Sequence, residues 1–122
     1  MSLIYLIFIQ LYMFSATPSA DSNYRQVLIF GKSQHPELVE QQLKLLNKDS
    51  NALKERDIKI IVVENESILW KQYKVAPVNY TVLLIGKDGS EKHRTVQILQ
   101  TADLFSMIDA MPMRQNEMRR KH

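Results

Sequence analysis

Cysteine is absent from all 122 residues of the sequence. The chain therefore forms no disulfide, offers no thiolate nucleophile or thiolate metal ligand, and runs no dithiol redox cycle. Glycine and proline are scarce, with 3 and 4 residues, while 45% of the residues are hydrophobic. This composition is typical of a folded domain rather than a disordered chain, and the length leaves room for one such domain.

Histidine is nearly as scarce, and its three residues lie far apart in the sequence, at His35, His93 and His122. A helical zinc site needs two such ligands four residues apart on one face of the helix. No spacing of that kind occurs here. The sequence therefore predicts neither a metal site nor a bound cofactor.

Residues 1–113 carry no excess of positive or negative charge. The formal net charge of +3 comes from the last nine residues, where four basic side chains accompany one acidic side chain, and the rest holds 12 of each. A balanced body lacks the basic face that a dedicated nucleic-acid-binding protein needs. The basic end has two interpretations: a solvated helix terminus favoured by the helix dipole, or a weak contact with an anionic surface.

No hydrophobic run is long enough to span a bilayer comfortably, which takes about 20 apolar residues. The run at residues 3–14 is broken only by Gln10, and small residues follow it up to Ala20. This pattern is typical of a secretory signal peptide. We expect residues 1–20 to be that signal, cleaved near Ser19 or Ala20, and the mature protein to be periplasmic or secreted, without a stable membrane anchor. An uncleaved anchor is the alternative.

The rest of the chain alternates strand and helix patterns. Short apolar runs predict strands at 25–30, 58–63 and 81–85, and the Asp-Gly turn at 88–89 predicts a returning strand at 92–96. Apolar residues at helical spacing predict helices at 37–46, 52–56, 65–73 and 101–111. With 52–56 counted as part of the first helical region, the order β-α-β-α-β-β-α predicts an α/β domain of thioredoxin-like shape, with three layers (α/β/α) around a central mixed sheet. We place this domain at 24–112 and a basic, solvent-facing helical tail at 113–122.

Two stretches of the chain form a family signature. The first is the run 81–89, followed by Lys92 and Arg94, and the second is the run 104–118, which contains Pro112 and Glu117. Together they resemble the P-DUDES domain, which is shared by animal extracellular proteins of the DRO, URB, Equarin and sushi-repeat group and by many small exported bacterial proteins. The resemblance covers roughly residues 25–121.

The resemblance implies a thioredoxin-like fold, related in shape to the peroxiredoxins, without a defined activity. Animal members are secreted and associated with extracellular matrix and adhesion, and a short chain with its own signal is similar to the bacterial members. Active thioredoxins carry their cysteines in the loop after the first strand, which here reads Gly-Lys-Ser-Gln-His-Pro at 31–36. Thr81 stands where a cis-proline would face those cysteines. The resemblance therefore extends to the fold and not to thiol chemistry.

The loop residues Ser33, Gln34 and His35 are the candidate ligand site, because they precede a predicted helix. Unpaired N–H groups at a helix N-terminus can bind an anion or stabilise an oxyanion. Ser33 and His35 also suggest a nucleophile and a base, although no acidic residue that would orient the histidine is evident. The alternative is a polar loop that only leads into the helix.

The signature residues have a structural interpretation; they are Lys87, Asp88, Gly89, Arg94, Asp109, Pro112 and Arg114. Asp88 and Gly89 suit a hairpin turn. Asp109 lies near the end of a helix, where the dipole disfavours an acid. We expect Arg114 or Arg94 to pair with Asp109 and to lock the last helix against the hairpin. A role in binding is the alternative.

A candidate partner surface lies at the end of the chain and consists of Met113, Met118, Arg119 and Arg120. Methionines can form adaptable binding surfaces, and packing of these side chains in the core is the alternative.

These features favour an exported, non-catalytic binding or adhesion module whose partner is a protein or an envelope or extracellular component. The rival hypothesis is an enzyme, derived from an oxidoreductase or acting as a hydrolase, that uses the 31–36 loop. A subunit without activity of its own is the third. An enzyme predicts a concave pocket beside Ser33 and His35 with convergent polar groups, whereas a binding module predicts an exposed patch around 113–120.

Overall fold

The computed structural model describes residues 23–121 of the chain. The predicted signal at 1–20 and the terminal His122 lie outside these residues. Among the described helices, none combines the length and the hydropathy that a membrane crossing requires.

A mixed sheet of four strands forms the centre of the domain, in the order β2-β1-β3-β4. The strands are β1 (Arg25–Phe30), β2 (Ile58–Val62), β3 (Thr81–Ile85) and β4 (Glu91–Thr95). Strand β1 pairs parallel with β2 and antiparallel with β3, and β3 pairs antiparallel with β4. The crossover from β1 to β2 gives the parallel pair, and the Asp-Gly turn gives the hairpin of β3 and β4, as the sequence predicts.

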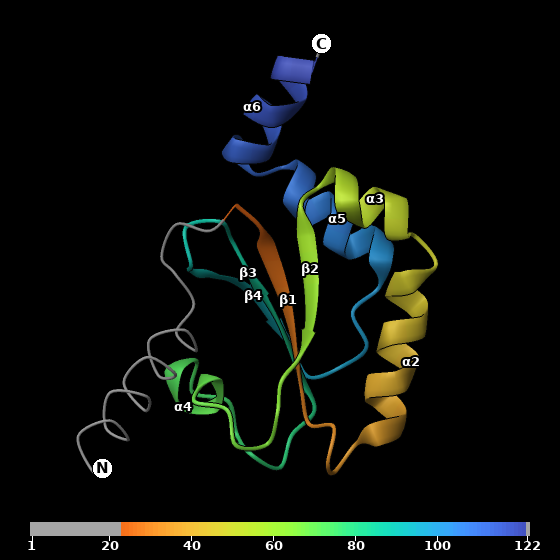
Figure 1. The fold of residues 1–122 in the computed structure, drawn as a ribbon, viewed down its shortest axis with the longest axis vertical. Helices are drawn as coiled ribbons and strands as arrows, with labels where there is room; N and C mark the ends of the chain where they lie inside the picture. Colours follow the sequence, from red (N-terminus) through yellow and green to blue (C-terminus); the bar gives the residue numbers. More distant parts are fainter. Residues whose placement is uncertain (1–22, 122) are drawn as a thin grey trace, which may run out of the picture.

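The described part of the chain has five helices: α2 (Pro36–Asn47), α3 (Ser50–Glu55), α4 (Leu69–Gln72), α5 (Thr101–Asp109) and α6 (Pro112–Lys121). Helices α2, α3 and α5 lie on one face and α4 lies on the other, whereas α6 projects from one end of the domain (Figure 1). The expected three-layer α/β/α architecture of thioredoxin-like shape is confirmed.

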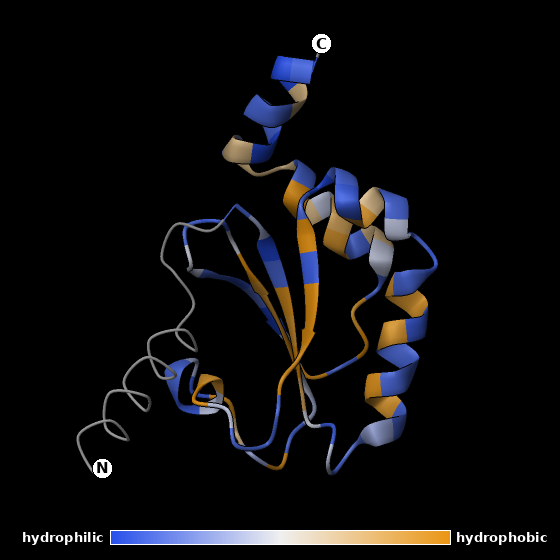
Figure 2. Ribbon diagram, in the orientation of Figure 1, coloured by the Kyte–Doolittle hydropathy of each residue, from blue (hydrophilic) through white to orange (hydrophobic). Residues whose placement is uncertain are grey.

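Two hydrophobic cores lie on opposite sides of β1. Val27 and Ile29 point toward α2 and α5, whereas Leu28 and Phe30 point toward α4. All four side chains are fully buried because both faces of this central strand are covered. The central strands are accordingly the most hydrophobic part of the ribbon, while β4 at the edge and α6 are mostly polar (Figure 2).

One buried amide joins three separate segments of the larger core. Gln42 of α2 is 0% exposed, and its Nε2 donates to the carbonyl oxygen of Leu99 at 2.8 Å. Its Oε1 accepts from the backbone N–H of Leu99 at 2.7 Å and from the hydroxyl of Tyr80 at 2.8 Å. The Gln42 amide thereby satisfies both backbone groups of Leu99, in the segment that leads into α5.

Two helix predictions were wrong in detail. Residues 65–73 were expected to form one helix, but only Leu69–Gln72 is helical. The hydroxyl of Ser67 accepts a hydrogen bond from the backbone N–H of Leu69, and such local side-chain bonds compete with helix formation. The tail was expected to face solvent throughout, but Arg114 in α6 is buried.

Candidate functional site

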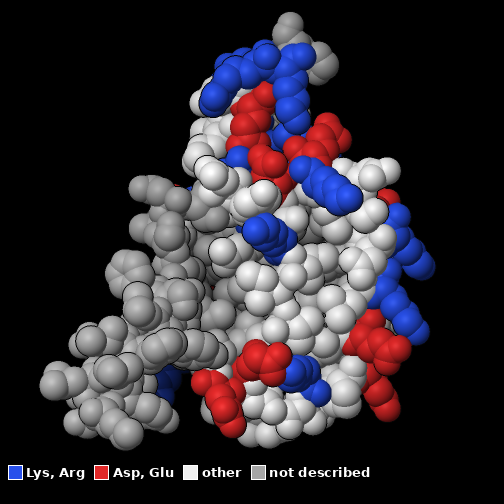
Figure 3. Space-filling view, viewed as in Figure 1, with Lys and Arg blue, Asp and Glu red and all other residues white. Residues whose placement is uncertain are grey.

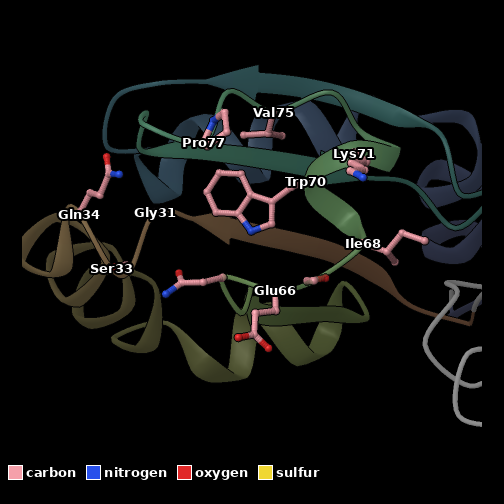
Figure 4. Close-up of a pocket in the computed structure, with 11 residues that line it drawn as sticks. Gly31, Ser33, Gln34, Glu66, Ile68, Trp70, Lys71, Val75 and Pro77 are labelled. Carbon is pink, nitrogen blue, oxygen red and sulfur yellow. The ribbon is translucent and has the colours of Figure 1, made fainter. Parts of the chain in front are cut away.

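A cavity of about 720 Å³ opens where β1 ends (Figure 4). Its polar lining comes from two loops: Gly31, Ser33 and Gln34 follow β1, and Asn65, Glu66 and Ser67 follow β2. The remaining lining comes from Ile68 just before α4, from Trp70 and Lys71 in α4, and from Val75 and Pro77 after it. In open α/β sheets, ligands bind in the crevice outside the carboxyl ends of the strands. This cavity occupies that position.

Gly31 sets the path of the first loop. Its φ is +106°, a conformation that residues with a side chain rarely adopt. A Cβ atom at this position would also lie 3.1 Å from the Cα of Tyr80 and 3.2 Å from the carbonyl oxygen of Asn79. Glycine therefore lets the loop leave β1 close to the backbone that precedes β3.

The indole of Trp70 lies in the middle of the lining residues (Figure 4). Its Nε1 donates to the carbonyl oxygen of Glu64 at 3.0 Å. Phe30 meets it in an edge-to-face arrangement, with ring centroids 4.9 Å apart and an interplanar angle of 78°. These two contacts hold the ring in place, so the indole offers the cavity a fixed apolar surface.

Four polar side chains around this indole make no hydrogen bond or ion pair with any other described residue: Ser33, Gln34, Asn65 and Glu66. Hydroxyl and amide groups both donate and accept hydrogen bonds, and a carboxylate accepts them. The cavity thus combines a rigid apolar surface with polar groups that are available to a ligand.

His35 takes no part in this lining, although it lies in the same loop. It precedes α2, and its Nε2 lies 2.9 Å from the carbonyl oxygen of Val78. A carbonyl oxygen only accepts, so Nε2 carries the proton and donates it. The ring ties the loop to the segment before β3, and no hydrogen bond joins His35 to Ser33 within residues 23–121.

The enzyme hypothesis is therefore met only in part. A concave pocket lies beside Ser33, as that hypothesis predicts, but the expected base is turned to a backbone carbonyl. Within residues 23–121, no group of three His, Asp or Glu side chains is placed to hold a metal ion.

Three of the signature residues, Lys87, Asp109 and Arg114, meet at the opposite end of β1, where α6 joins the body. We call this group the α6 ion-pair cluster; its members are Arg25, Arg56, Lys87, Asp109, Arg114 and Glu117. Acidic and basic side chains gather at this end of the molecule (Figure 3).

Asp109 at the end of α5 holds one half of the cluster. Arg56 donates to both of its carboxylate oxygens, at 3.0 and 2.9 Å, and Arg114 donates from Nε at 3.3 Å. The expected pairing with Arg114 is present, whereas the alternative pairing with Arg94 is wrong. The expected lock against the hairpin through Asp109 is also wrong, because the two arginines join Asp109 to the end of α3 and to α6. Arg94 instead pairs with Glu91 and donates to backbone carbonyls at the end of α4.

Glu117 on α6 holds the other half. It accepts from the fully buried Arg25 at 3.2 and 3.3 Å, and from Lys87 at 2.7 Å. Lys87 also pairs with Asp57 at 2.9 Å. Because Arg25 begins β1 and Lys87 follows β3, these contacts fix α6 to the sheet itself.

The cluster keeps both of its acids ionised. Hydrogen bonds from Arg56 hold the pKa of Asp109 below its ordinary value, with Arg114 adding to the effect. Burial raises the pKa of Glu117, but hydrogen bonds from Lys87 and Arg25 outweigh burial and leave the pKa lowered. The acids and bases of the cluster are therefore ionised and paired with one another, which is typical of ion pairs that stabilise a fold.

Asp88 and Gly89 form the expected turn. The Asp88 carboxylate accepts from the backbone N–H and the hydroxyl of Ser90 and pairs with Lys92. These contacts lower its pKa to about 2. Gly89 takes the positive φ of 82° that the turn requires.

The four residues of the proposed partner surface differ in exposure, because one side of α6 packs against the body of the domain. Met113 is 51% exposed, and Arg119 and Arg120 are exposed, whereas Met118 is half-buried. Three of the four predicted residues are therefore exposed on α6, and their role as a partner surface stays a prediction.

Sequence reasoning missed the residues that complete each site. Arg25, Arg56 and Trp70 were not singled out, although Arg25 begins the predicted strand at 25–30 and Arg56 ends the predicted helix at 52–56. One signal was available: a basic residue at the first position of an otherwise buried strand needs an acidic partner.

The model of one protein family matches residues 19–117, a range that contains both the cavity and the α6 ion-pair cluster; its description is "Domain of unknown function (DUF4174)". Neither a curated protein nor a solved structure matches the chain.

Proposed function

The chain belongs to this family, DUF4174, as its sequence signature indicated, and we propose that it is an exported, non-catalytic binding module whose ligand site is the cavity at the end of β1. The family description assigns no activity, so the proposal rests on the residues themselves. The observation that carries it is the fixed indole of Trp70 surrounded by polar side chains that lack partners among the described residues.

The absence of suitable chemical groups supports binding over catalysis. The chain has no cysteine, so thiol redox chemistry is excluded. A serine nucleophile needs a base within hydrogen-bond reach. Here the Nε2 of His35 is hydrogen-bonded to the carbonyl oxygen of Val78, and the Ser33 hydroxyl donates to no described side chain.

The proposed location follows from the sequence. A run of apolar residues at 3–14 and the small residues after it are typical of a cleaved signal. We expect the ligand to be an envelope or extracellular component or an exported protein. Cell fractionation, followed by N-terminal sequencing of the recovered protein, tests this part; recovery of the intact chain in the cytosol would contradict it.

A fragment screen followed by protein NMR tests the binding site. We expect the indole N–H signal of Trp70 and the backbone amide signals of Ser33 and Asn65 to shift with binding fragments. The amide signals around Arg25 and Glu117, at the other end of β1, serve as the internal control and should remain unchanged. Turnover of an activated ester that is lost in Ser33→Ala would overturn the non-catalytic assignment.

A further inference from the structure

We propose that the ligand of the cavity is a neutral carbohydrate, bound with the apolar face of a sugar ring on Trp70. This inference rests on the proposed function, because it names the ligand class of the same site. It is derived from the shape of the apolar surface, the kind of polar groups around it and their charge.

The indole of Trp70 is a flat apolar surface, and its one polar atom, Nε1, already forms a hydrogen bond. The Nε1 of Trp70 donates to Glu64, and Phe30 packs edge-to-face against the ring. The indole therefore offers a ligand a rigid apolar face and no hydrogen-bond donor. A pyranose ring has such a face of C–H groups, with hydroxyl groups around its edge.

The polar groups of the lining match those hydroxyls. Gln34 and Asn65 contribute amides, Ser33 contributes a hydroxyl and Glu66 contributes a carboxylate. A sugar hydroxyl both donates and accepts hydrogen bonds. The amides and the hydroxyl of the lining do the same, and the carboxylate accepts, so each of these groups can bond to a sugar hydroxyl. These side chains extend from two loops next to the indole, with Ser33 and Gln34 to its left and Glu66 below it in Figure 4.

The charge of the lining disfavours anionic ligands. Among the lining residues, Glu66 carries the negative charge and Lys71 the positive charge. The other nearby cation, Lys32, is paired with Glu64. Recognition of phosphate or of a carboxylate typically uses arginine in bidentate geometry or a cluster of cations. The lining has no net charge and suits a neutral ligand.

The backbone around the cavity disfavours an extended peptide. Peptides commonly bind by adding a strand to a free sheet edge, which supplies main-chain hydrogen bonds. Strand β1, whose end borders the cavity, is paired on both sides, with β2 and with β3. No residue of β2 lines the cavity. A peptide therefore finds no free strand edge in the described lining. The polar side chains of the lining suit recognition of hydroxyl groups instead.

Titration with neutral trisaccharides tests the proposal. The probes are triacetylchitotriose, cellotriose and maltotriose, each added to the purified full chain. Trp70 is the single tryptophan of the sequence, so its fluorescence reports on the cavity directly. We expect saturable binding of at least one probe, with calorimetry giving the same Kd.

Two variants and a control assign the site. Asn65→Ala and Gln34→Ala should each weaken binding at least fivefold, because each removes hydrogen bonds to the sugar. Asn51→Ala replaces an exposed amide on α3, away from the lining, and should leave Kd unchanged. Circular dichroism spectra that match the unsubstituted protein confirm that the variants are folded.

The outcomes separate this inference from the proposed function. Absence of saturable binding by all three trisaccharides at millimolar concentration overturns the carbohydrate assignment. If an acetylated trileucine amide then binds and shifts Trp70, the cavity remains a binding site for a different ligand class. Hydrolysis of a bound trisaccharide overturns the non-catalytic function instead.

Discussion

Arg56 binds Asp109 through two parallel hydrogen bonds, 3.0 Å from Nε to Oδ1 and 2.9 Å from Nη2 to Oδ2. The same guanidinium lies over the ring of Phe105, 4.1 Å from its centroid. This pair joins the segment after α3 to the end of α5. The helix dipole disfavours an acid at that position, and the bidentate pair offsets the penalty.

Asp109→Asn should destabilise the domain. The substitution leaves Arg56 without its acid and removes one of the acidic partners of the buried Arg114, so we expect the free energy of unfolding to fall by about 1–3 kcal/mol in urea denaturation. Glu40→Gln is the control, because it breaks the exposed Glu40–Lys44 pair of α2 and should cost at most about 0.5 kcal/mol. Equal effects of the two substitutions would show that the α6 ion-pair cluster has no special role.

Glu117→Gln should release α6 from the sheet. The helix is mostly polar, so its docking depends on Glu117 accepting from Arg25 and Lys87. We expect faster trypsin cleavage at Arg114, which is 2% exposed in the intact protein, while the core stays folded. Gln115→Ala, on the exposed side of α6, should leave the cleavage rate unchanged. An unchanged rate in Glu117→Gln would contradict the assigned role.

Acid should weaken the same cluster. The pKa values of Asp109 and Glu117 lie below their ordinary values of 3.8 and 4.5. A lowered pKa in the folded state means that the unfolded chain binds these protons more readily. Their contribution to stability is thus complete above about pH 4.5 and is lost as the pH falls through the lowered values.

Urea denaturation at pH values from 7 down to 3 measures this loss. The double variant Asp109→Asn, Glu117→Gln should show a shallower decline below pH 4.5 than the unsubstituted protein. Parallel curves for the two proteins would mean that other carboxyl groups govern the acid sensitivity.

Gly31→Ala should be costly because of the backbone and not because of lost contacts. The positive φ of 106° and the close approach of Tyr80 both oppose a side chain, and we expect a loss of about 1–3 kcal/mol. Gly86→Ala is the matched comparison: its Cβ would meet chiefly the flexible side chain of Lys92, without a positive φ. Thermal unfolding measures the stability of both variants. A larger loss of stability in Gly86→Ala than in Gly31→Ala would contradict the role assigned to the Gly31 backbone.

Gln42→Leu should rank among the most destabilising single changes in the domain. It leaves the Tyr80 hydroxyl and both backbone groups of Leu99 without partners in a buried site, which costs about 2–4 kcal/mol. Gln41→Leu, at an exposed position of the same helix, is the control and should change stability by less than about 0.5 kcal/mol. Chemical denaturation of both variants measures the difference. A near-neutral Gln42→Leu would show that the amide is replaceable by packing.

The sequence by itself determined the architecture, because local patterns specify local structure. The apolar runs and the hairpin turn place the strands within one residue of their observed limits, as at Ile58–Val62 and Glu91–Thr95. The Asp88-Gly89 turn follows from the positive φ that glycine tolerates. The absence of cysteine excludes thiol redox chemistry directly from the sequence.

Only the tertiary structure decided which charges and which cavity residues meet. Asp109 has Arg56 as its main partner, 53 positions away in the chain, and no sequence spacing indicates such a pair. Likewise, Trp70 and Ser33 come to line one cavity because the parallel pairing of β1 and β2 places their following loops side by side. Contacts between distant segments depend on how the layers pack, and periodicity within a segment carries no information about that packing.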